Sequence, residues 1–155
     1  MMPDREPNQP QMAALKSLEK SIRAEDANEA ENAVTAAYRS GLHPCHVRPL
    51  ITLLDAPWHH SHEDIAHNLQ LLRSPEAIEA LERTTHSHLK YLEYDSGYAL
   101  KRKCTWALAD IGTTEAREAL ERIAENDDPE IAAYAKKRLD HWEQEIARKG
   151  TSPNS

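Results

Sequence analysis

The sequence predicts an all-α fold: a right-handed α-solenoid of about three to four stacked helix pairs. Apolar residues recur at helical spacing along most of the 155 residues, and only 4 of these residues are glycine. The octapeptide EAIEALER at 76–83 returns as EAREALER at 115–122, with seven of the eight positions identical. Because one helix pair cannot bury its apolar stripe alone, neighbouring copies are expected to stack.

Apolar positions beyond this octapeptide set the register of the repeat. The basic period is 31 residues, with about eight residues inserted between Thr85 and Gly97. The aligned sets are Pro44, Val47 and Leu50 with Pro75, Ile78 and Leu81, and Leu100, Cys104 and Leu108 with Ile131, Ala135 and Leu139. A match that extends over helix pairs in one register is much harder to obtain by chance than a match over a single helix.

Local signals then place each helix along the chain. A helix at about 10–24 precedes the repeats. First helices are expected at 28–40, 62–73, 97–111 and 129–147, and second helices at 44–55, 75–85 and 114–126. Capping and turn residues support these bounds: Ser74-Pro75, Thr113-Thr114 and Asp128-Pro129 at helix starts, and Gly112 at a helix end.

The two ends of the chain differ from the middle in composition. Residues 1–9 and 149–155 are rich in Pro, Ser, Asn and Gly, and both segments are predicted to be disordered tails. Residues 10–148 then form one repeat domain.

Composition and charge narrow the class of function. The net charge of -7 argues against a nucleic-acid-binding protein, which usually carries a basic surface. No apolar run approaches the about 18 residues of a membrane-spanning helix, and MMPDREPNQPQ lacks the apolar centre of a signal peptide. Cys45 and Cys104 do not make a disulfide framework, so a reducing cytoplasm is the expected location. Cys104 aligns with Ile65 and Ala135, which predicts a packed core thiol.

The segment 99–139, ALKRKCTWALADIGTTEAREALERIAENDDPEIAAYAKKRL, resembles the short HEAT-like repeat of phycobilisome-lyase-type proteins. The resemblance extends over about 62–140 and, more weakly, over 28–56. It implies HEAT-like helix pairs. This repeat occurs in enzymes and in passive binding proteins alike, so function has to be argued from individual side chains.

The histidine-rich stretch Trp58–Asp64, WHHSHED, raises the question of a metal enzyme. His62-Glu63 stands where deoxyhypusine hydroxylase, an enzyme with this repeat, places a His-Glu pair for its di-iron centre. In the repeat register, however, Lys101-Arg102 occupies the next equivalent position and Ala132-Ala133 the one after. Two metal ions need ligands from more than one helix, so this ligand set is absent.

A looser metal site remains as an alternative. His59 and His60 follow one second helix, and His86 and His88 follow the next, so stacking is expected to place these two turns at one edge of the solenoid. Such an edge would suit a metal-dependent or lyase-like enzyme. The other interpretation is that these histidines are polar turn residues that cap helices. The sequence contains no nucleophile constellation and no glycine-rich phosphate loop.

A repeated row of carboxylates offers a surface for a partner protein. The second helices are expected to line the concave side of the solenoid, and each places glutamates outward. This acidic set comprises Glu76, Glu79, Glu82, Glu115, Glu118, Glu121 and Glu125. The alternative is that Glu79–Arg83 and Glu118–Arg122 are i,i+4 pairs that only support solvated helices.

The insertion HSHLKYLEYDSGY is a second candidate surface. It supplies Tyr91 and Tyr94 where the other repeats have a short turn, and tyrosine is efficient interface material. These side chains could equally pack back over the solenoid.

We therefore predict a protein–protein interaction module, with no catalytic residues and no cofactor. One specific hypothesis is an immunity protein that occludes a basic bacterial toxin, because a compact acidic binder would complement such a target. The rival within the same class is an adaptor or assembly factor. The sequence sets neither the partner nor the oligomeric state.

Overall fold

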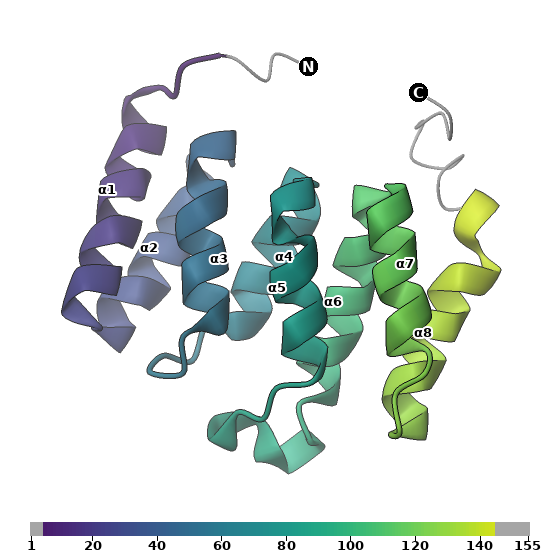
Figure 1. The fold of residues 1–155 in the computed structure, drawn as a ribbon. Helices are drawn as coiled ribbons and strands as arrows, with labels where there is room; N and C mark the ends of the chain where they lie inside the picture. The colour runs from purple at the N-terminus through teal and green to yellow at the C-terminus, as the bar shows by residue number, and fades with distance from the viewer. Residues whose placement is uncertain (1–4, 145–155) are drawn as a thin grey trace.

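The computed structural model describes residues 5–144 as two layers of antiparallel helices (Figure 1). One layer contains α1 (Gln9–Ala24), α3 (Val47–Asp55), α5 (Ile78–Thr85) and α7 (Thr114–Ile123). The other contains α2 (Ala27–Arg39), α4 (His62–Leu72), α6 (Tyr98–Ile111) and α8 (Pro129–Asp140). The chain runs down one layer and up the other while it advances, which makes the predicted right-handed solenoid.

Capping side chains define where the helices begin. Asn8 accepts a hydrogen bond from the backbone N–H of Gln11, whose side chain bonds back to Asn8, so α1 starts with a full capping box. Asp26, Thr113 and Asp128 cap α2, α7 and α8, each with a side-chain oxygen that accepts a hydrogen bond from a backbone N–H of the first turn. Two second helices open with a proline-led 3-10 turn, η1 (Pro44–His46) and η2 (Pro75–Ala77).

The N-terminal boundary of the repeat domain lies earlier than residue 10. Asn8 is already the cap of α1, and the carbonyl oxygen of Arg5 accepts a hydrogen bond from His43 Nε2 at 2.6 Å. Residues 5–9 thus contact the body through this hydrogen bond and through the start of α1, within the segment predicted as a tail at 1–9. The rest of that tail, the predicted tail at 149–155 and the end of the last predicted helix lie outside the described residues.

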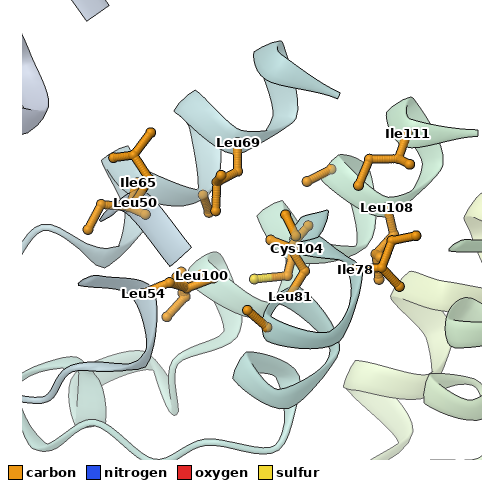
Figure 2. Packing of buried hydrophobic residues seen from close by; sticks show 14 of the residues in the cluster. Leu50, Leu54, Ile65, Leu69, Ile78, Leu81, Leu100, Cys104, Leu108 and Ile111 are labelled. Carbon is orange, nitrogen blue, oxygen red and sulfur yellow. The ribbon is translucent and has the colours of Figure 1, made fainter. Parts of the chain in front are cut away.

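A continuous apolar core joins the two layers. Its members are mostly Leu, Ile and Ala, and positions that align in the repeat, such as Leu69 and Leu108, are both fully buried. Figure 2 shows Cys104 among Leu81, Leu100 and Leu108. Burial raises the pKa of the Cys104 thiol to about 12, so this cysteine is the unreactive core thiol that the repeat register predicted.

The terminal helices close the ends of the solenoid. α1 packs against α2 and α3, so it takes the place of a second helix in an incomplete first pair. α8 packs against α6 and α7, and Trp142, which follows it, is buried beside the Arg117 guanidinium. Repeat proteins need such closure because each unit contacts only its neighbours.

The insertion between α5 and α6 forms η3 (Lys90–Asp95) and folds back on the body. Leu92 is buried in the core and Leu89 packs against it. Tyr94 instead projects into solvent, with 78 % of its surface exposed. The insertion therefore packs back over the solenoid through Leu89 and Leu92, while Tyr94 lies on the surface.

Candidate partner-binding surface

The second-helix face is the outer surface of α3, η2–α5 and α7, which lie side by side in Figure 1. Six of the seven predicted glutamates are exposed: Glu76, Glu79, Glu115, Glu118, Glu121 and Glu125. Glu82 is half-buried between α5 and α7. On η2–α5 the buried side of the helix is formed by Ala77, Ala80 and Leu81. The helical period therefore directs the glutamates between them toward solvent.

Arginines on this face bind carboxylates of the neighbouring repeat. Arg83 contacts Asp55 at 2.8 Å, and Arg48 contacts Glu76 at 3.4 Å, so two ion pairs join α3 to η2–α5. Arg122 makes two hydrogen bonds of 2.8 Å to the carboxylate of Glu82, joining α7 to α5. The predicted i,i+4 pairs Glu79–Arg83 and Glu118–Arg122 are therefore not the ones that form.

These cross-repeat pairs leave an excess of negative charge. Every arginine of α3, α5 and α7 is engaged, since the remaining one, Arg117, lies 3.7 Å from Glu121. Four exposed glutamates make no ion pair within residues 5–144, and we call them the carboxylate ladder: Glu79, Glu115, Glu118 and Glu125. Glu79 and Glu118 lie near enough to Arg83 and Arg122 to raise the pKa of those guanidinium groups, but the arginines make their ion pairs with Asp55 and Glu82.

The insertion adjoins the end of this ladder. Asn126 Nδ2 lies 3.3 Å from His86 Nδ1, so the turn that carries Glu125 touches the start of the insertion. Tyr94 stands exposed on η3, while Tyr91 is half-buried and stacks on the ring of His60, with centroids 4.2 Å apart. Burial raises the pKa of Tyr91 to about 12, so its hydroxyl stays protonated at neutral pH.

Comparison with known families identifies the repeat. Residues 100–126, which span α6 and α7, match the family model of the PBS lyase HEAT-like repeat. α6 and α7 therefore form a HEAT-like repeat unit, and the other helix pairs stack beside it in the same solenoid. HEAT-like repeats generally mediate protein interactions, through the extended surfaces that stacked helices create. Comparisons with curated proteins and with solved structures give no match.

Within the HEAT-like solenoid, His59 and His62 have structural roles. His59 Nε2 donates to the carbonyl oxygen of Leu53 at 2.7 Å, and Nδ1 accepts from the backbone N–H of Ser61 at 3.0 Å. His62 Nε2 donates to the carbonyl oxygen of Ala56 at 2.6 Å, and Nδ1 accepts from the Tyr91 hydroxyl at 2.8 Å. All four ring nitrogens are thus occupied, and the two rings stack 4.1 Å apart.

The alternative metal site of His59, His60, His86 and His88 is not assembled in the structure. His59 is fully buried, and His60 stacks on Tyr91. His86 contacts Asn126, and His88 Nε2 lies 2.8 Å from a Glu93 carboxylate oxygen. Across residues 5–144, no three His, Cys, Asp or Glu side chains are grouped so that they could hold a metal ion.

The repeat pattern alone did not predict the cross-repeat partners Arg48 and Asp55. Their spacing could have indicated these ion pairs, because Arg48 and Glu76, and likewise Asp55 and Arg83, are oppositely charged and 28 residues apart, close to the repeat period.

Along the described part of the chain, no helix is long and apolar enough to cross a membrane.

Proposed function

We propose that this HEAT-like protein is a non-catalytic binding module that captures a basic partner protein on its second-helix face. The observation that carries the proposal is the carboxylate ladder. All arginines of α3, α5 and α7 are engaged in ion pairs, whereas Glu79, Glu115, Glu118 and Glu125 make none within residues 5–144. A partner that brings lysines or arginines to this face would supply the missing charges.

The rigidity of the face supports this role. Two ion pairs between α3 and η2–α5, and one bidentate pair between α5 and α7, hold neighbouring helices in fixed register. Glutamates on such helices are presented at set spacings, which lowers the entropic cost of binding. A concentration of like charge also accelerates encounter with an oppositely charged partner.

Tyr94 extends this surface with an aromatic contact. It is 78 % exposed, and the insertion that carries it touches the turn of Glu125 through the contact between His86 and Asn126. Buried aromatic anchors beside a charged region are frequent hot spots of protein interfaces. We expect Tyr94 to contact the partner, whereas Tyr91 holds the insertion in place.

A narrower form of the proposal is an immunity protein that neutralises a basic bacterial toxin in the cytoplasm. It is supported by the compact size, the net charge of -7 and the two free cysteines, which fit a reducing compartment. A toxin gene immediately beside the gene for this chain would support this form. An isolated metabolic setting would count against it and leave the broader proposal standing.

The binding face is tested by charge reversal. Glu79→Lys with Glu118→Lys should weaken affinity for the partner by tenfold or more and flatten its salt dependence, because two ladder positions then repel a basic surface. Partners are captured with the full chain, purified, and measured by isothermal titration calorimetry.

The matched control changes net charge equally but elsewhere. Glu19→Lys with Glu31→Lys reverses two exposed carboxylates on α1 and α2 and should leave affinity within about twofold. Equal affinity of the ladder variant and the wild type, or an equal loss in the control, would refute binding on this face.

A further inference from the structure

A groove of about 320 Å³ runs between α6 and α8, on the layer opposite the carboxylate ladder. α6 contributes Arg102 and Trp106, and α8 contributes Tyr134, Lys137 and Arg138. α6 and α8 are first helices of successive repeats and pack against each other. It shares no residue with the ladder.

The floor of the groove is aromatic. The guanidinium of Arg138 lies 3.6 Å from the centre of the Trp106 ring, and Arg138 is buried while Trp106 is half-exposed. At this distance the cation covers one face of the indole and fixes its orientation. Tyr134 packs edge-on against Tyr98, with ring centroids 6.4 Å apart. Burial, together with a hydrogen bond to Glu130, raises the pKa of Tyr134 to about 12, so this wall is uncharged at neutral pH.

The rim of the groove is positive. Arg102 and Lys137 are exposed, and neither makes an ion pair within residues 5–144. The contrast with the second-helix face is sharp, because there every arginine is bound by a carboxylate. Glu130 on α8 accepts a hydrogen bond from the Tyr134 hydroxyl.

We propose that this groove binds an acidic linear segment of a second partner protein. An apolar side chain of that segment rests on Trp106 and Tyr134, and flanking carboxylates meet Arg102 and Lys137. Ligand pockets commonly measure about 300–1,000 Å³, so a site of this size takes two or three side chains. A nucleic-acid strand is a poorer fit, because it needs a long series of cations and this chain carries a net charge of -7.

The inference does not depend on the proposed function of the other face. The groove and the ladder lie on opposite layers, so both can be occupied at once (Figure 1). A molecule that holds a basic partner on one side and an acidic segment on the other acts as a bridge between them. Occupancy of the groove would therefore favour an adaptor over a simple inhibitor.

The test uses the indole N–H signals of the full-length, ¹⁵N-labelled protein. The probe is an acetylated and amidated pentapeptide with two glutamates on each side of a leucine. We expect the Trp106 signal to shift in a saturable manner and those of Trp58 and Trp142 to stay in place. Raising the salt concentration should weaken binding, because the rim charges are solvent-exposed.

Variants and competing ligands decide the outcome. Arg102→Glu with Lys137→Glu should weaken binding by about tenfold or more, whereas Lys16→Glu with Arg23→Glu, on α1, should leave it unchanged. Both pairs are exposed, and circular dichroism checks that each variant folds. Three results would overturn the proposal: no Trp106 shift at millimolar peptide, equal binding of a glutamine-for-glutamate peptide, or tighter binding of single-stranded oligothymidine.

Discussion

At the scale of single residues, His59 and His62 act as caps at the C-terminal end of α3. Their Nε2 atoms donate to the carbonyl oxygens of Leu53 and Ala56. The hydroxyl of Tyr91, which belongs to the insertion, donates a hydrogen bond to Nδ1 of His62. Protonation of His59 at Nδ1 would break its bond from Ser61, since a backbone N–H cannot accept a hydrogen bond. The two rings also stack, so a second charge would face the first.

This arrangement predicts a loss of stability in mild acid. Burial lowers the pKa of His62 to about 4, below its ordinary value of 6.5. Between these values the unfolded chain binds more protons than the folded one, so the free energy of unfolding falls as pH drops from 6.5 to about 4. The loss of stability due to His62 is at most about 3 kcal/mol, and above pH 6.5 this residue causes no further change in stability. Urea denaturation at a series of pH values measures it.

His62→Gln isolates the effect from other titrating groups. The variant should be less stable than the wild type at neutral pH but should lose less stability on acidification. His67→Gln, at an exposed position, should retain the full pH dependence. An unchanged slope in His62→Gln would contradict the assignment of this dependence to His62.

The repeat register predicted that WHHSHED lies where one helix pair turns into the next, and it excluded the di-iron ligand set. It could not predict which carbonyl groups the histidines bind. Those bonds depend on α3 ending at Asp55 and on Tyr91 folding back from residues far along the chain. If α3 ended one residue earlier or later, or if Tyr91 were displaced by one residue, the histidines would have different hydrogen-bond partners.

At the scale of elements, the second helices are joined by charges from adjacent repeats. Sequence spacing pointed to i,i+4 pairs, because Glu and Arg four residues apart lie on one side of a helix. In the solenoid a parallel neighbouring helix offers a carboxylate within reach. Arg122 donates two hydrogen bonds of 2.8 Å, one to each carboxylate oxygen of Glu82. Two parallel bonds to a planar carboxylate match a guanidinium better than a single longer contact.

A double-mutant cycle separates the two pairings. Glu82→Gln and Arg122→Gln should show a coupling energy of about 0.5–1 kcal/mol in urea denaturation, modest because Arg122 is 59 % exposed. The cycle between Glu118→Gln and Arg122→Gln should give a value near zero. A larger coupling energy for Glu118 with Arg122 than for Glu82 with Arg122 would indicate that the pair within α7 dominates in solution.

At the scale of the whole molecule, the predicted helices appear in the predicted order and layers. The apolar period and the copied octapeptide were enough, because a helix pair that must bury one stripe has few ways to stack. The insertion was harder to predict. Its conformation depends on contacts of Leu92 and Tyr91 with distant helices, and nothing in its own sequence distinguishes the half-buried Tyr91 from the exposed Tyr94.

The layered architecture predicts that a destabilising substitution in a terminal helix affects only the helices next to it. Leu18 in α1 and Leu108 in α6 are both fully buried, but α1 packs mainly on α2 and α3, whereas α6 packs on α4, α5, α7 and α8. Leu108→Ala should lower the free energy of unfolding by about 3 kcal/mol. Leu18→Ala should instead raise amide hydrogen exchange in α1 and α2 and leave the protection of α5–α8 close to that of the wild type, because each unit contacts only its neighbours. A uniform rise of exchange in all helices of Leu18→Ala would mean that the solenoid opens as one cooperative unit.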